Sequence, residues 1–238
     1  MLKLENLSKS YAKNKVLAVD SLNLEIPGGE IFGFIGPNGA GKTTTIKMIC
    51  GILSPTSGRV VIGDSDMATA PIAAKKQIGY VPDNHDVYER LTGVEYLNFI
   101  GDVYGVSADI RRKRAEKYLT MFEIADAAGE KISSYSHGMK QKLMITAALL
   151  SNPPLWVLDE PMVGLDPKSA MLLKEEMSAH CAAGNSVFFS THVLEVAERL
   201  CDRIGIINHG KLVAIGTLDE LRRGGNETLE KLFLELTE

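Results

Sequence analysis

The chain has 238 residues, and its 26 Lys and Arg against 30 Asp and Glu give a net charge of −4. This balance argues against a general nucleic-acid binder, which usually carries a basic surplus. The cysteines Cys50, Cys181 and Cys201 are scattered, which fits buried thiols in a reducing compartment better than a disulfide framework. We expect neither a signal peptide nor a membrane span, because no apolar run approaches the roughly 20 residues that a bilayer requires.

The sequence contains two kinds of strand-like pattern. Strand-like runs occupy residues 2–7, 22–26, 31–35, 59–62, 78–81, 155–158, 187–190 and 204–207. The later runs are continuously apolar and separated by helical patterns, which is typical of parallel strands buried on both faces. The early runs are closely spaced and joined by Gly and Pro turns, which favours an antiparallel sheet. We therefore predict an α/β fold with a parallel core sheet and an N-terminal antiparallel β subdomain.

The strand patterns stop between residues 84 and 150, where three helical segments follow. Thr92 and Glu95 form a possible capping box that opens a helix to about Tyr104. Further helices are expected at 107–122 and in the stretch that ends at 150. We predict a helical subdomain, 84–150, inserted in an α/β body of residues 1–83 and 151–216. A capping box at 217–220 and an amphipathic helix form a short tail, 217–238.

A phosphate-binding loop is predicted directly after the strand at 31–35. Gly36, Gly41, Lys42 and Thr43 fit the pattern G-x-x-x-x-G-K-[ST], with an apolar strand before it and a helix after it. In such a loop, backbone N–H groups and the helix dipole bind phosphate oxygens. The loop runs through Gly36, Pro37, Asn38, Gly39, Ala40, Gly41, Lys42 and Thr43. Lys42 is expected to reach the terminal phosphates, and Thr43 to place its hydroxyl on Mg²⁺. A Gly-rich turn with a solvated lysine is the weaker alternative.

Two further strands end in side chains that suit hydrolysis of a nucleoside triphosphate. In "LWVLDEP", Asp159 suits Mg²⁺ and Glu160 can polarise an attacking water, although both acids could simply lie on the surface. His192 follows the strand "SVFFST". A lone histidine in this position is more often structural, but the neighbouring strand ends favour a γ-phosphate contact.

The helix in "SSYSHGMKQKLMITAALL" begins in an unusual way. It opens on Ser136, His137 and Gly138, and Lys140 and Lys142 lie in its first turns. A helix N-terminus already carries partial positive charge, so cations there are mildly unfavourable. We predict that this helix N-terminus lacks a neutralising partner and binds an anion. A capped surface helix is the simpler alternative.

Taken together, these motifs resemble the ATP-binding subunits of ABC transporters over nearly the whole chain. The diagnostic order is the phosphate loop, the helical insert with its signature, the acid-ended strand, "VGLDP" and then His192. The chain looks most like bacterial export or efflux subunits and Ecs-type transporter ATPases. The resemblance implies that two chains pack head to tail, so that Ser136 and the backbone at Gly138 meet the γ-phosphate of the partner's ATP.

Two departures from the family pattern stand out. The family signature is Leu-Ser-Gly-Gly-Gln, whereas residues 135–139 here, called the signature below, are Tyr-Ser-His-Gly-Met. His137 either adds a pH-sensitive contact or points aside, and Met139 lacks an amide for the interface. After "IGYVP" the family places a Gln, and here Asp83 stands instead. Asp83 can still hold Mg²⁺ through water, but its charge beside Glu160 alters the electrostatics.

Three more positions match the family. Tyr11 falls where an aromatic ring stacks on adenine, although it could equally serve packing. Thr44 is expected to place its hydroxyl on the α-phosphate. Asp166 in "VGLDP" matches the loop that crosses to the partner subunit, which is compatible with a role as helix N-cap before Pro167.

The resemblance implies an ATPase that uses ATP and Mg²⁺ and drives separate transmembrane subunits from the cytoplasmic face of the membrane. Its dimer partner is a second copy or a paralogue, and no nucleic acid is involved. A short helix of the membrane subunit is expected in a groove lined by "DNHDVYERLT", residues 83–92. Two alternatives are a soluble ABC-type ATPase acting on DNA or ribosomes, and an inactive nucleotide-gated module.

Overall fold

The computed structural model describes residues 1–11, 17–84, 88–222 and 228–237. In this part of the chain a six-stranded sheet has the order β10-β9-β3-β8-β7-β6. Its strands are β3 (Ile31–Ile35), β6 (Ile78–Val81), β7 (Leu155–Asp159), β8 (Ser186–Thr191), β9 (Arg203–Asn208) and β10 (Lys211–Gly216). All are parallel to their neighbours except β10, which pairs antiparallel with β9. Every residue of β3, β7 and β8 is buried, as their continuous apolar character predicts.

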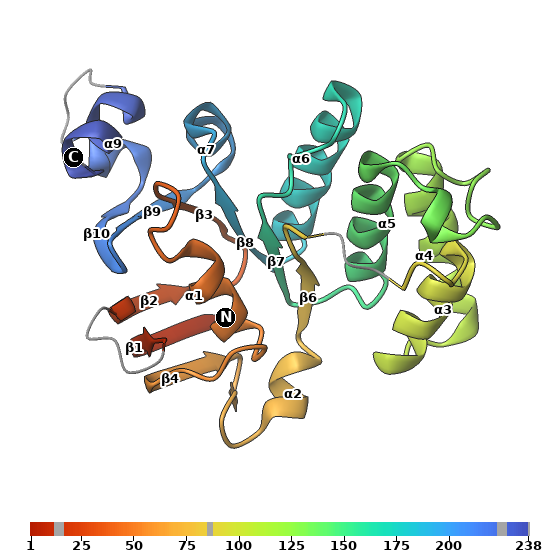
Figure 1. The fold of residues 1–238 in the computed structure, drawn as a ribbon, viewed down its shortest axis with the longest axis horizontal. Helices are drawn as coiled ribbons and strands as arrows, with labels where there is room; N and C mark the ends of the chain where they lie inside the picture. The colour runs from red at the N-terminus through yellow and green to blue at the C-terminus, as the bar shows by residue number, and fades with distance from the viewer. Residues whose placement is uncertain (12–16, 85–87, 223–227, 238) are drawn as a thin grey trace.

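The second sheet is antiparallel and lies across the first (Figure 1). Its described strands have the order β2-β1-β4-β5, with bounds Leu2–Ser10 for β1, Leu17–Ile26 for β2, Ser57–Ile62 for β4 and Ser65–Asp66 for β5. One face of this sheet is apolar and faces the six-stranded sheet. Leu4 and Leu22 on that face join Phe188 of β8 in one hydrophobic cluster. The expected α/β class with an antiparallel β subdomain is confirmed.

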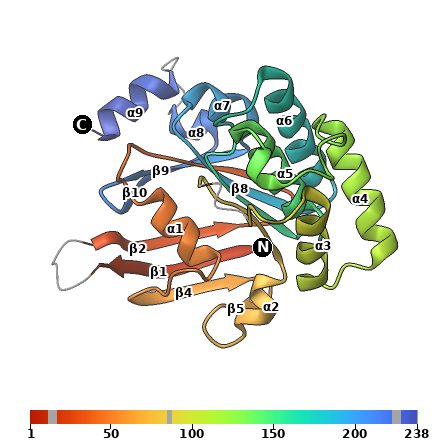
Figure 2. The ribbon, with the colours of Figure 1, turned by 45° about the vertical axis from the view of Figure 1, so that its right-hand side comes forward.

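Helices cover both sides of the six-stranded sheet. Helix α1 (Lys42–Ile49) lies between the two sheets, where Ile46 and Ile49 join their shared core (Figure 2). Helices α6 (Pro167–Ala182) and α7 (Leu194–Leu200) pack on the opposite side, with Leu173 of α6 beside Trp156 of β7 in one cluster. The remaining helices of this body are α2 (Pro71–Lys75), α8 (Leu218–Leu221) and α9 (Leu229–Thr237).

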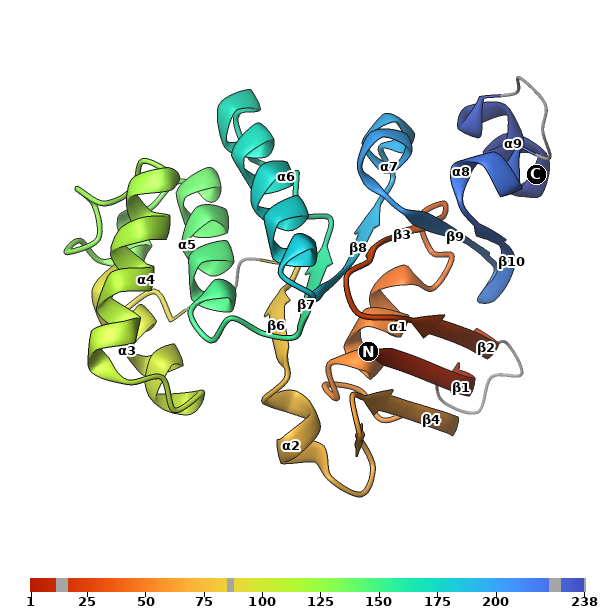
Figure 3. The same cartoon turned by 180° about the vertical axis from the view of Figure 1, so that it is seen from behind.

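A helical segment lies at one end of the molecule, next to β6 (Figure 3). It contains α3 (Gly93–Val103), α4 (Ala108–Met121), the 3₁₀ turn η1 (Ile132–Ser134) and α5 (His137–Leu149). The capping box of Thr92 and Glu95 is present as predicted. Helix α5 connects β6 to β7 and contacts β6, so it is the crossover helix of a parallel strand pair. The segment that contains α3 and α4 is therefore an insertion in the crossover connection between β6 and β7.

Some elements were not expected from the sequence. The short strand β5, the strand β10 and the five-residue helix α2 were missed, and β1 and β2 extend beyond their predicted ends. Strand β10 alternates exposed and half-buried residues at the edge of the sheet, so it lacks the continuous apolar run that marks its neighbours. Among the described helices, none combines the length and the apolar character that a membrane crossing requires.

Candidate functional site

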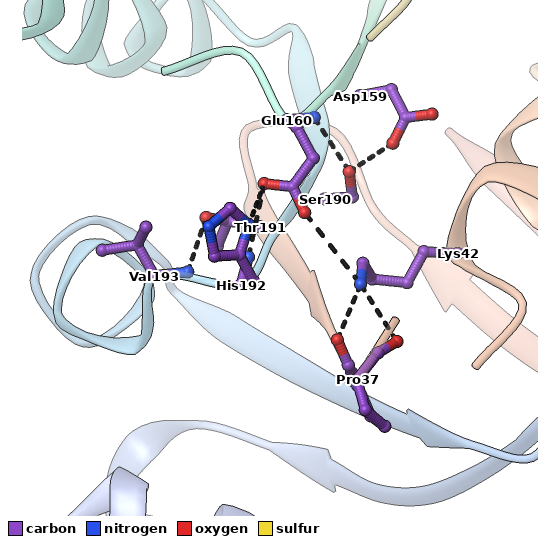
Figure 4. A network of polar contacts seen from close by, with 9 residues as sticks. Pro37, Lys42, Asp159, Glu160, Ser190, Thr191, His192 and Val193 are labelled. Carbon is purple, nitrogen blue, oxygen red and sulfur yellow. Dashed lines mark hydrogen bonds and ion pairs between the residues drawn. The ribbon is translucent and has the colours of Figure 1, made fainter. Parts of the chain in front are cut away.

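The ends of three adjacent strands bring the predicted site residues together (Figure 4). Strands β3, β8 and β7 are parallel neighbours, and their register pairs Ile35 with Thr191 and Ser190 with Asp159. Parallel strands end at the same edge of a sheet, where side chains of successive loops converge. The phosphate loop after β3, the acids after β7 and His192 after β8 therefore share one edge.

The phosphate loop depends on glycine at two positions. Gly41 caps α1 with a φ of 111°, a left-handed conformation that favours glycine. A Cβ at Gly36 would lie 2.3 Å from the carbonyl oxygen of Ile207, so no larger side chain fits there. The chain can thus turn tightly from β3 into α1 and direct the helix N-terminus at the cavity.

Lys42 is held against this loop. The residue is 7% exposed, and its Nζ donates to the carbonyl oxygens of Gly36 at 2.6 Å and Pro37 at 3.3 Å. Oε1 of Glu160 lies 4.0 Å from the same Nζ. Burial lowers the pKa of Lys42, and the carboxylates of Glu160 and Asp159 oppose that shift. The ammonium group is therefore positioned where phosphate oxygens can replace the carbonyl oxygens.

Asp159 is completely buried at the end of β7. Its Oδ1 accepts a hydrogen bond of 2.6 Å from Oγ of Ser190, while its Oδ2 has no hydrogen-bond partner within the described residues. Burial raises the pKa of Asp159; the hydroxyls of Ser190 and Thr43 lower it, and the nearby acids Asp83 and Glu160 raise it. A buried carboxylate oxygen that lacks a partner, close to a threonine hydroxyl, fits Mg²⁺, which prefers a few protein oxygens together with water and phosphate.

Glu160 and His192 are in direct contact. Oε2 of Glu160 accepts from Nδ1 of His192 at 2.9 Å and from its backbone N–H at 3.3 Å. Glu160 has a φ of 49°, an uncommon conformation for a residue with a side chain. Its carboxylate lies between His192 and Lys42. In the structure His192 contacts Glu160, and its γ-phosphate contact stays a prediction.

A cavity of about 240 Å³ lies in front of these residues. It is lined by Ala18, Pro37, Asn38, Gly39, Gly41, Lys42, Thr43, Thr44, Asp83 and Glu160. Tyr11 lies at its rim: its hydroxyl is 3.3 Å from Oγ1 of Thr44, and the residue is half exposed. Ala40 is buried in the loop, where its N–H donates to the carbonyl oxygen of Pro37.

The signature residues do not line this cavity. Ser136 is the N-cap of α5, and its Oγ accepts from the backbone N–H of Met139 at 3.3 Å. His137 and Gly138 lie against Gly164: a Cβ on Gly164 would come within 2.3 Å of the His137 ring, and one on Gly138 within 2.7 Å of the Gly164 carbonyl oxygen. The signature is therefore packed on the loop that follows Glu160.

The prediction that the lysines of α5 lack neutralising partners is wrong. Lys140 pairs with Glu89 at 2.6 Å, and Lys142 pairs with Asp166 at 2.8 Å. Both acids come from segments outside the helix, so helical spacing within α5 cannot indicate them. The N-terminal turn of α5 remains a candidate for binding an anion.

Asp166 has two structural roles. It is the N-cap of α6, where it accepts from the backbone N–H of Ser169 at 2.9 Å and from its hydroxyl at 2.7 Å. Together with the Lys142 ammonium, these donors hold the pKa of Asp166 well below its usual range. Gln141 donates to the carbonyl oxygen of Pro161 at 2.9 Å. Gln141 and Lys142 thus hold both ends of the segment 161–166.

Sequence reasoning missed Ser190 and Gln141. Ser190 had a detectable signal, since it is a polar residue inside a buried apolar strand. Gln141 had none, because a glutamine in the second turn of a helix ordinarily lies in solvent.

Comparison with known proteins decides the family. A family model described as ABC transporter matches residues 19–163, more than half of the chain. The chain belongs to the ABC transporter ATP-binding family. Its place in the family confirms the predicted fold and the predicted ATPase activity, because solved cassettes with the same fold include a post-hydrolysis state with ADP and Pi.

Two curated relatives from Bacillus subtilis illustrate the similarity of this ABC ATPase to known subunits. The linearmycin resistance ATP-binding protein LnrL is 39% identical over 97% of this chain and 74% of its own length. The ABC-type transporter ATP-binding protein EcsA is 38% identical over 100% of this chain and 96% of its own.

Solved structures of ABC ATP-binding proteins are also similar to this chain. An ATP-binding subunit of an ABC transporter superimposes with a TM-score of 0.95 at 36% identity, covering 100% of both chains. The cassette MJ0796, solved as a dimer bound to ADP and Pi, superimposes with a TM-score of 0.83 at 29% identity, covering 92% of this chain and 99% of that one.

Proposed function

We propose that two of these chains, identical or paralogous, bind two ATP molecules head to tail and that hydrolysis drives separate transmembrane subunits, in export. The observation that carries this proposal is the separation of the signature from the chain's own phosphate loop. ATP bound to that loop needs a second contact surface, which the partner's signature can provide.

The strand order sets this separation. The phosphate loop follows β3, whereas α5 contacts β6, three strands away. Three strand spacings amount to about 14 Å between β3 and β6. The 240 Å³ cavity is also smaller than the roughly 300–1,000 Å³ of pockets that enclose a small ligand. A single chain therefore offers only part of an ATP site.

The geometry supports in-line attack of water on the γ-phosphate. Glu160 accepts the proton of the water while the new O–P bond forms, and the bond between the γ-phosphorus and the bridging oxygen breaks. Lys42 exchanges its carbonyl partners for phosphate oxygens and neutralises their charge. His192, already bonded to Glu160, holds that carboxylate and lies within reach of the γ-phosphate.

The remaining contacts are assigned from the lining of the cavity. Mg²⁺ would be held by Thr43 and Asp159, with Asp83 acting through water, and would neutralise phosphate charge. The loop amides of 36–41 and the hydroxyl of Thr44 bind the phosphate chain. Tyr11, at the rim of the cavity, would stack on the adenine.

The direction of transport is inferred from the relatives. Besides LnrL, similar proteins include a daunorubicin/doxorubicin resistance ATP-binding protein from Streptomyces peucetius and a Nod factor export ATP-binding protein from Cupriavidus metallidurans. Their names describe resistance and export, which favours an exporter.

The membrane subunit is proposed to dock beside α3. Tyr88 and Phe99 form an edge-to-face pair with ring centroids 5.5 Å apart, and both are exposed, by 62% and 43%. Val103 on the same helix is 56% exposed. Exposed apolar side chains of this kind suit a helix from another subunit. Residues 85–87 of the predicted groove lie outside the described residues. Docking here would place the chain on the cytoplasmic face of the membrane.

Mixing two defective variants tests the shared site. Lys42→Ala disables the phosphate loop and Ser136→Arg disables the signature, so neither variant alone can form a complete site. A dimer of one chain of each kind contains one complete site, and mixing the purified chains is expected to restore phosphate release. Ser133→Arg, in the exposed turn before the signature, is the matched control and should be active alone. Folded variants that gain no activity when mixed would refute a site shared between two identical chains.

A further inference from the structure

Ser190 links the two acids of the site through one buried hydroxyl. Its side chain is fully buried in β8. The Oγ donates to Oδ1 of Asp159 at 2.6 Å and accepts from the backbone N–H of Glu160 at 3.0 Å. Since a hydroxyl has one donor and two acceptor positions, a single group can make both bonds at once. Figure 4 shows Ser190 between the two residues.

The bond to Glu160 falls where the backbone is strained. Glu160 adopts a φ of 49°, a conformation that is unfavourable for a residue with a side chain and persists only where the surrounding structure holds it. The bond from its N–H to Ser190 opposes a return to the ordinary strand conformation. That conformation would turn the Glu160 side chain away from Lys42 and His192.

Thr191, the next residue of β8, shapes the backbone on the His192 side of the contact between Glu160 and His192. Oγ1 of Thr191 accepts from the backbone N–H of Val193 at 3.0 Å, which shapes the turn that carries His192. Two consecutive hydroxyls of one strand thus set the backbone on each side of the bond between Glu160 and His192.

We propose that Ser190 is a positioning residue for ATP hydrolysis, fixing the orientation of Asp159 and the backbone of Glu160 together. This inference rests on the proposed roles of those two acids. Removing the hydroxyl takes away the bond to the part-buried N–H of Glu160 and the bond to the buried Oδ1 of Asp159. Both groups then reorient, although neither reacting side chain has been changed.

The chain supplies a matched control in the same strand. Ser186 is also fully buried in β8, and its Oγ donates to the carbonyl oxygen of Pro27 at 2.7 Å, at the end of the strand away from the site. Ser186→Ala removes one buried hydroxyl bond without touching Asp159 or Glu160. Any effect that stems only from loss of stability should appear in both variants.

The experiment compares Ser190→Ala, Ser186→Ala and Glu160→Gln in the full chain. We expect Ser190→Ala to lower kcat by about 10- to 100-fold, the usual effect of removing a group that orients a site carboxylate, with a change in the KM for ATP of less than about threefold. Binding of a fluorescent ATP analogue in EDTA should be unchanged, whereas more Mg²⁺ should be needed to reach the metal-dependent signal.

Different results distinguish failure of the proposed role of Ser190 from failure of the proposed function. Normal turnover in Ser190→Ala beside a silent Glu160→Gln would overturn the inference alone, and so would equal losses in Ser190→Ala and Ser186→Ala. Normal turnover in Glu160→Gln would overturn the proposed function itself. If Ser190→Ala does not fold, Ser190→Cys, which keeps a weak donor of similar size, is compared with Ser186→Cys by the same measurements.

Discussion

Replacing Gly138 by alanine tests whether the signature is packed on its own chain before any nucleotide binds. Gly138 lies in the first turn of α5, where alanine is normally better than glycine by about 0.5–1 kcal/mol. Here the new Cβ would lie 2.7 Å from the backbone carbonyl oxygen of Gly164. A backbone atom cannot rotate away as a side chain can, so the helix or the loop has to shift.

Overpacking of this kind costs about 1–3 kcal/mol. Subtracting the gain in helix propensity leaves an expected net loss of roughly 0–2.5 kcal/mol in the free energy of unfolding. Gly129→Ala is the control: a Cβ there meets no atom within 4 Å among the described residues, and the residue is not left-handed. That variant should be neutral or slightly stabilised, because alanine restricts the unfolded chain.

The measurement is urea unfolding of the purified chain without nucleotide or Mg²⁺. If Gly138 served only to admit a partner's phosphate, Gly138→Ala would stabilise the isolated chain as alanine does in other helices. A stabilisation of about 1 kcal/mol would therefore refute the packing of the signature on Gly164.

Three further predictions concern single side chains. Burial lowers the pKa of His180, whose Nε2 bonds to the Pro153 carbonyl, so stability present above about pH 6.5 should be lost as the pH falls toward the folded pKa. His180→Gln should flatten this loss in urea titrations between pH 7.5 and 5.5, and an unchanged slope would contradict it. Lys142→Met should raise the pKa of Asp166 toward its ordinary value in a carboxyl NMR titration, whereas Lys142→Arg should not. Asp83→Gln should keep ATPase activity in a phosphate-release assay; complete loss would show that the acid has a specific role.

The parts of the fold that sequence predicted best are those with a strong local pattern. Strands β3 and β7 are continuously apolar, and the phosphate loop is a fixed motif between a strand and a helix, so both could be located from neighbouring residues alone. Strand β10 has no such pattern, because it lies at an edge and alternates its exposure. Local patterns of this kind indicate burial, and an edge strand is only partly buried.

The functional site likewise contains residues that the sequence could locate and contacts between them that it could not. Motif spacing identified Lys42, Glu160 and His192, but their mutual contacts depend on strand order, which is a property of the tertiary fold. The pairing of Lys142 with Asp166 joins residues 24 positions apart, and so no helix or strand period can indicate it. The same holds for Ser190 and Asp159, whose 31-residue separation is closed only by the sheet register.

The position of α5 has a mechanical consequence. This helix has 13 residues and is thus about 20 Å long, with its C-terminal half buried against the body and its first turn at the exposed edge. A rigid rod anchored at its far end amplifies rotation, so a tilt of about 10° displaces its tip by about 3.5 Å. Because α5 also contacts α3, small rotations at the proposed docking surface could reach the signature as movements of atomic size.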